Sequence, residues 1–161
     1  MKITVPVYPD YELREEYLRE FRRADVDRIL FVVDREFGPE AAKKAAENVR
    51  RCIEFYDGFG YSCAVWIGST IGHGVYLVNR GAEEEREYTL IRGVHGEERG
   101  EAYCPLDERF RRDISRFVAA FADVGAEFIL LDDDFRLAHD FVGCACELHL
   151  AALGKEIGHA V

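Results

Sequence analysis

The sequence predicts an α/β fold in which successive strand–helix units build a parallel sheet. Residues 28–34, 61–68 and 127–132 form short continuous apolar runs, which are typical of strands covered on both faces of a parallel sheet. Between them lie segments with apolar residues at i, i+3, i+4 and i+7, the pattern of an amphipathic helix. Parallel strands joined through helices make right-handed βαβ units.

Each element has its own signal. The β-branched residues at 3–8 indicate a first strand, and Pro6 favours the edge of a sheet. Proline suits the first helical turn, and glycine commonly follows the last one. The expected helices begin near Asp10, at 38–39, at 104–107 and at Cys146, and the last three end at Gly58, Gly125 and Gly154.

Residues 69–104 interrupt this rhythm. They contain an acidic run at 83–85 and a predicted hairpin around Gly96, with arms at 88–91 and 101–103. The segment keeps aromatic and β-branched residues, so we interpret it as an insertion in one α/β domain that spans 1–161, and not as a linker.

Composition excludes several classes of protein. A net charge of −10 with no basic stripe argues against binding to nucleic acid or anionic membranes. No apolar run reaches the ~20 residues of a membrane span. The strand-like N-terminus lacks the features of a signal peptide, and the five cysteines are an odd number. We therefore expect reduced thiols and a cytoplasmic protein.

Polar side chains gather where the predicted strands end, the edge at which parallel α/β proteins bind ligands. Three neighbouring carboxylates, Asp132, Asp133 and Asp134, repel one another and need protons, cations or solvent to coexist. They fit either an acid, base or nucleophile, or a turn whose aspartates accept backbone N–H bonds. The first interpretation makes Asp133 and Asp132 catalytic. The substrate-binding candidates are Asp134, Arg136, Asp34, His73, Trp66 and Tyr8.

Each of these secondary candidates also has a structural interpretation. Tyr8 and Trp66 fit either a platform for a sugar ring or core packing. His73, between two glycines, fits either close approach to a ligand or a turn. Asp34 follows a strand, where aspartate is common.

The sequence predicts no metal and no cofactor. Cys144, Cys146 and His149 suggest a metal site, but the C-x-C spacing is tight and no second cysteine pair supplies a fourth ligand, so buried thiols are expected. A helix-start cysteine with a lowered pKa is the other alternative. The sequence contains neither the G-x-x-x-x-G-K pattern of a phosphate-binding loop nor a G-x-G-x-x-G pattern after the first strand.

Three motifs together resemble the N-terminal half of glycoside-hydrolase-like TIM barrels. They are Cys104-Pro105-Leu106-Asp107 at a helix start, Asp132-Asp133-Asp134-Phe135-Arg136 after the fourth strand, and Gly143-Cys144-Ala145-Cys146 before the next helix. The resemblance implies that Asp132 and Asp133 contact or cleave a sugar, with Asp134 and Arg136 in support. It implies a four-stranded half of a (β/α)8 barrel, and a compact open sheet is the alternative.

An eight-stranded barrel needs about 200 to 250 residues, more than this chain has. We therefore expect either a fragment of a longer barrel, inactive alone because the second carboxylate is missing, or two copies that associate through their open sheet edges. A non-catalytic ligand-binding or protein-interaction domain is the alternative function. A phospho-receiver domain fits this alternative poorly, because its acidic pair follows the first strand.

Overall fold

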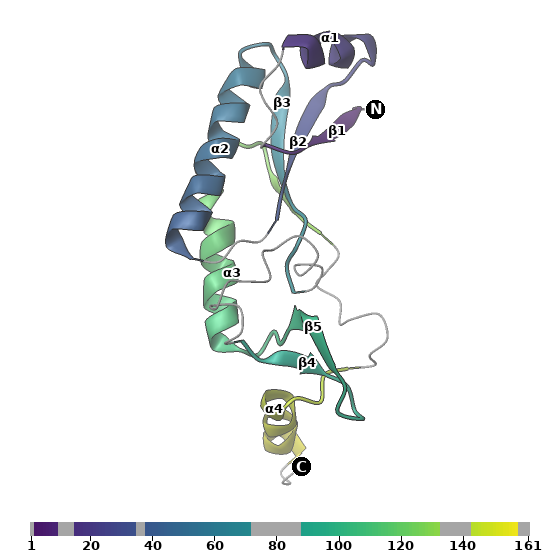
Figure 1. Cartoon of the computed structure of the whole chain (residues 1–161), viewed down its shortest axis with the longest axis vertical. Helices are drawn as coiled ribbons and strands as arrows, with labels where there is room; N and C mark the ends of the chain where they lie inside the picture. Colours follow the sequence, from purple (N-terminus) through teal and green to yellow (C-terminus); the bar gives the residue numbers. More distant parts are fainter. Residues whose placement is uncertain (1, 10–14, 35–37, 72–87, 133–142, 158–161) are drawn as a thin grey trace.

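The computed structural model of the chain describes residues 2–9, 15–34, 38–71, 88–132 and 143–157 (Figure 1). Strands and helices alternate through most of this length, as the sequence predicts. In chain order the elements are β1 (Thr4–Val7), α1 (Glu15–Arg23), β2 (Arg28–Val33), α2 (Pro39–Asp57), β3 (Ser62–Ile67), β4 (Leu90–Arg92), β5 (Glu98–Tyr103), α3 (Glu108–Ala120), β6 (Ile129–Leu131) and α4 (Glu147–Ile157).

Four strands form one parallel sheet in the order β1-β2-β3-β6. Val33 of β2 is in register with Ile67 of β3, and Ile67 is in register with Leu131 of β6. The predicted parallel α/β class is therefore confirmed. Because β1 and β6 are the outer strands, the sheet is open and does not close into a barrel within the described residues. Pro6 lies on an outer strand, where its missing N–H costs no ladder bond.

The main core lies between the sheet and helices α2 and α3. Figure 1 shows both helices on the same side of the strands. Phe31 and Val65 point from the sheet into this core, and Phe117 and Phe121 reach it from α3; all four are buried. Alternation along the strands sends their neighbours to the opposite face. The two faces of the sheet therefore have different surroundings.

The predicted hairpin is present and forms a second, smaller apolar cluster. Strands β4 and β5 pair antiparallel, and Gly96 adopts a φ of 87° in the turn between them. That left-handed conformation favours glycine. The rings of Tyr88, Tyr103 and Phe110 pack against one another in edge-to-face and tilted arrangements beside the fully buried Ile91. The hairpin thus packs against the start of α3.

Two helix ends differ from the prediction. Helix α3 ends at Ala120, because Phe121 already caps it and Gly125, with φ 88°, closes a later turn. Helix α4 continues through Gly154 to Ile157. A glycine inside an exposed helix costs only about 1 kcal/mol and does not by itself end the helix.

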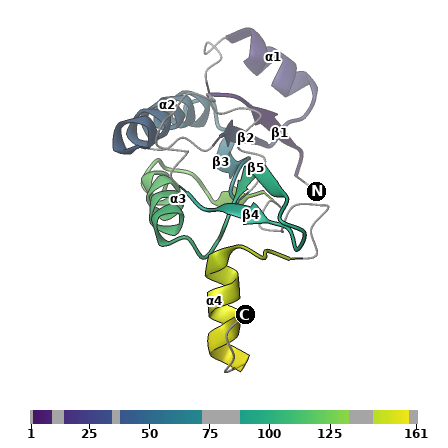
Figure 2. The ribbon, with the colours of Figure 1, turned by 60° about the horizontal axis from the view of Figure 1, so that its bottom comes forward.

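Helix α4 projects away from the rest of the fold beyond the hairpin (Figure 2). Leu148 and Leu153 remain 38% and 46% exposed on it. Among the described residues, no helix combines the length and apolar character required to cross a membrane.

Candidate functional site

Four potential metal ligands converge where the hairpin, α3 and α4 meet. They are Cys104, Cys144, Cys146 and His149, and their ligand atoms all lie within 4.8 Å of one another. All five cysteines of the chain are free thiols, so no disulfide competes for these sulfur atoms. Three cysteines with one histidine are one of the ligand combinations of structural zinc sites.

Cys104 is held at the junction between β5 and α3. Its backbone N–H donates to the carbonyl of Thr89 at 2.7 Å, and the N–H of Leu106 donates to its Sγ atom at 3.4 Å. The side chain is fully buried. These bonds hold Cys104 beside the hairpin.

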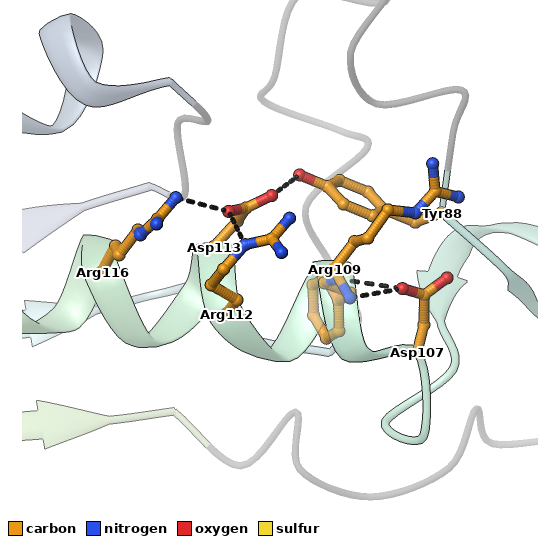
Figure 3. A network of polar contacts seen from close by, with 7 residues as sticks. Tyr88, Asp107, Arg109, Arg112, Asp113 and Arg116 are labelled. Carbon is orange, nitrogen blue, oxygen red and sulfur yellow. Dashed lines mark hydrogen bonds and ion pairs between the residues drawn. The ribbon is translucent and has the colours of Figure 1, made fainter.

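The turn after Cys104 is held by Asp107, the N-cap of α3. Its Oδ1 accepts hydrogen bonds from the backbone N–H groups of Arg109 and Phe110 at 2.9 and 3.1 Å, as Figure 3 shows. Its Oδ2 accepts one from the N–H of Thr89 at 2.8 Å. Burial would raise the pKa of Asp107, but these N–H donors outweigh burial and lower it. The carboxylate therefore joins the hairpin to the first turn of α3 next to Cys104.

A second carboxylate joins the same two elements one turn further along α3. The hydroxyl of Tyr88 donates to Asp113 at 2.7 Å, and Arg112 and Arg116 approach the other oxygen of that carboxylate (Figure 3). The β4–β5 hairpin and the start of α3 are thus held together by two carboxylates, and we call them the braced unit.

The other three ligands come from the start of α4. The N–H of Ala145 donates to the carbonyl of Arg92 in β4 at 2.7 Å, which holds the Cys-x-Cys segment against the hairpin. In the first helical turn, the N–H of Leu150 donates to the carbonyl of Cys146. Cys146 and His149 are three residues apart and therefore share one helix face.

Three of the four ligand atoms lie at distances close to those around a zinc ion. Nδ1 of His149 lies 3.2 Å from Sγ of Cys104 and 3.4 Å from Sγ of Cys146, and the two sulfur atoms are 3.5 Å apart. A tetrahedron with Zn–S bonds of about 2.3 Å and Zn–N bonds of about 2.0 Å has edges of about 3.8 Å between sulfur atoms and about 3.5 Å between sulfur and nitrogen. An ion would require movements of only a few tenths of an ångström at these three atoms.

The two buried thiols differ in acidity. Burial raises the pKa of Cys104 to about 12. Burial also disfavours the thiolate of Cys146, but hydrogen bonds with His149, Cys144 and Cys104 together outweigh that effect and lower its pKa to about 7. A cation among these atoms would favour the thiolate of every cysteine in the cluster.

Sequence reasoning found three of these four residues and missed Cys104. The argument against a metal was the lack of a fourth ligand near the Cys-x-Cys motif, and Cys104 supplies one from 40 positions earlier in the chain. The available signal was the Cys-Pro start of α3 combined with a predicted hairpin that could bring it back toward α4.

The strand-end candidates divide into two groups. Asp133, Asp134, Arg136 and His73 lie outside the described residues, and their predicted roles remain predictions.

Asp34 and Asp132 follow β2 and β6 directly, and Gly68 follows β3 between them. The N–H of Gly68 bonds to the carbonyl of Val33, and that of Asp132 bonds to the carbonyl of Ile67, so the three residues continue one row of the sheet.

This row faces away from α2 and α3. Two positions earlier on the three strands, the residues in register are Val32, Trp66 and Leu130. These alternate with the residues that point into the core, so Asp34 and Asp132 lie on the face of the sheet opposite the core. Oδ1 of Asp34 lies 3.3 Å from the position that a Cβ atom on Gly68 would occupy. The absence of a side chain at Gly68 thus lets the Asp34 carboxylate approach this position.

The aromatic candidates differ in exposure. Tyr8, directly after β1, is 47% exposed. Trp66 is half-buried, and its indole N–H is buried without a hydrogen-bond partner within the described part of the chain. A buried donor of this kind can bind an acceptor supplied from outside the described residues.

Comparison with protein-family models, curated proteins and solved structures found no match to this chain.

Proposed function

We propose that this chain binds one zinc ion through Cys104, Cys144, Cys146 and His149. The observation that carries the proposal is the convergence of four ligand atoms within 4.8 Å of one another. Three thiolates and one imidazole favour borderline-soft metals and disfavour calcium and magnesium, which take oxygen ligands.

The proposed role of the ion is structural. Four protein ligands complete a tetrahedron and leave no open position for a substrate, which distinguishes such a centre from a catalytic one. The ion would tie α4 to the braced unit of hairpin and α3. Few other contacts among the described residues hold this helix, since Leu148 and Leu153 stay exposed.

Metal analysis of the purified chain tests the proposal. We expect one zinc per chain after dialysis, and X-ray absorption should report three sulfur neighbours and one nitrogen neighbour. Cobalt substitution should give the intense visible bands of a tetrahedral thiolate site. A Cys146→Ser variant should lose the metal, whereas Cys52→Ala should keep it, because Cys52 lies in the separate main core. Zinc below one-tenth of an equivalent in the wild-type chain would contradict the proposal.

A carbohydrate site at the carboxyl ends of the strands is a second candidate, favoured by the row of Asp34, Gly68 and Asp132. Two steps between neighbouring strands separate the aspartate Cα atoms by about 9.6 Å. In this proposal Asp132 and Asp133 act on the sugar in a half-barrel, and Asp34, Trp66, Tyr8, His73, Asp134 and Arg136 contact it.

Saccharide binding by calorimetry or a glycan array tests this second candidate. Asp133→Asn and Asp132→Asn should abolish binding with little loss of stability. Asp123→Asn is the matched control, because Asp123 is an exposed aspartate in the turn after α3, where the chain leads into the opposite end of β6. Unchanged binding in both strand-end variants would rule out the assignment.

A further inference from the structure

Two of the four proposed zinc ligands form a close sulfur pair. Sγ of Cys104 and Sγ of Cys146 lie 3.5 Å apart. These are also the two most deeply buried thiols of the cluster, at 0% and 3% exposure, whereas Cys144 is partly exposed. A disulfide needs a sulfur–sulfur distance of about 2.05 Å, so closing this pair requires a movement of roughly 1.5 Å.

We propose that hydrogen peroxide oxidises Cys104 and Cys146 to a disulfide and thereby releases the zinc ion. This inference rests on the proposed zinc site and adds a redox control to it. Only Cys144 and His149 would remain as ligands, and two ligands do not form the closed tetrahedral site that holds structural zinc.

The reaction balances in two steps. The Cys146 sulfur attacks one oxygen of hydrogen peroxide, the O–O bond breaks, and water leaves as a sulfenic acid forms on Cys146. The Cys104 sulfur then attacks the sulfenic sulfur, the S–O bond breaks, and a second water leaves. Two thiolates, one peroxide and two protons thus give one disulfide and two waters, and the two electrons lost by sulfur reduce the peroxide.

The geometry favours this pair over the two cysteines of the main core, because Sγ of Cys104 and Sγ of Cys146 are 3.5 Å apart. Cys52 and Cys63 belong to the main core, whereas Cys144 contacts the smaller cluster beside the hairpin. Cys144 and His149 are the partly exposed members of the site, whereas Cys104 and Cys146 are buried.

The disulfide would also preserve the attachment that zinc provides. Cys104 lies at the β5–α3 junction and Cys146 directly precedes α4, so a bond between them ties the same two parts of the fold together. Oxidation should therefore release the metal without unfolding the chain, and a dithiol should reverse it.

The test treats the full zinc-loaded chain with a modest excess of hydrogen peroxide. A chromogenic chelator reports released zinc, and mass mapping after thiol blocking identifies the crosslink. We expect one zinc released per disulfide, a loss of two of the five free thiols, a Cys104–Cys146 crosslink, and recovery with dithiothreitol and added zinc.

Two variants that retain four ligands provide the controls. Cys144→His should release zinc with the same crosslink, because the sulfur pair is intact. Cys104→His should release it at least tenfold more slowly, because Cys146 has lost this partner. Equal release rates in the two variants, or a Cys144–Cys146 crosslink in the wild type, would overturn the inference. A chain that binds no zinc before oxidation would instead refute both proposals, whereas bound zinc without the crosslink would refute only this one.

Discussion

Nδ1 of His149 lies 3.2 Å from Sγ of Cys104, although the two residues are 45 positions apart in the chain. This contact joins the first turn of α4 to the junction of β5 and α3. It brings Cys104 into a set of four ligands, of which the Cys-x-Cys motif and the following histidine supply only three.

The first prediction concerns His149, the nitrogen ligand of the proposed site. His149→Ala removes one of four donors and should weaken zinc binding at least about 100-fold, since even losing a hydrogen-bond partner of a ligand costs about 10- to 100-fold. His149→Cys should restore tight binding as a site of four cysteines. Competition against a chelator of known affinity measures both. Equal affinity in the wild type and His149→Ala would exclude the histidine as a ligand.

The second prediction concerns removal of the metal. Chelation should increase hydrogen exchange in α4 and in the β4–β5 hairpin and leave β2 and β3 protected, because the latter belong to the main core. Zinc present at 1,000 times its dissociation constant stabilises the folded chain by about 4 kcal/mol. The melting temperature should therefore rise with free zinc. Uniform exchange changes across the sheet would contradict a local role for the ion.

Much of the fold could be predicted because local signals and burial agree. The apolar run at β3, the proline at the start of α2 and the Cys104-Pro105-Leu106-Asp107 start of α3 each occur where the structure places the element. Helix α4 was less predictable, because few tertiary contacts fix its end and Gly154 is tolerated there. The metal cluster depends on contacts between α4 and a cysteine far earlier in the chain, which periodicity does not reveal.

The third prediction concerns the cap of α3. Asp107→Ala should destabilise the chain by about 2 kcal/mol, combining a lost N-cap of about 1 kcal/mol with an unsatisfied, part-buried N–H of Thr89 worth about 1 kcal/mol. Asp107→Asn keeps an acceptor oxygen and should cost less. Urea denaturation at neutral pH measures the difference.

The same carboxylate predicts a pH dependence. Its pKa is lower in the folded chain than its ordinary value. Its stabilising contribution is therefore complete above the unfolded pKa of about 3.9 and is lost as the pH falls through the folded value. The stability gap between the wild type and Asp107→Asn should narrow below about pH 4 and stay constant above about pH 5. A gap independent of pH would show that the charge of Asp107 contributes nothing.

The final prediction concerns Gly68, between the two strand-end aspartates. An added Cβ atom would lie 3.3 Å from Oδ1 of Asp34, 3.7 Å from Val32 and 3.8 Å from the carbonyl of Val33. The aspartate side chain is the contact that can move, so Gly68→Ala should displace it and keep the fold, changing stability by less than about 1 kcal/mol. If Asp34 and Asp132 bind one sugar, this displacement should reduce affinity at least tenfold. Gly60→Ser is the control, because Gly60 lies far from this edge and an added Cβ there has no atom within 4 Å. Gly60 has a φ of 86°, so the substitution should lower stability and leave saccharide affinity unchanged. If Gly68→Ala binds saccharide as the wild type does, the position between the aspartates is not the binding position. The added methyl group is the only change on this row of the sheet, so it would then lie outside the binding site.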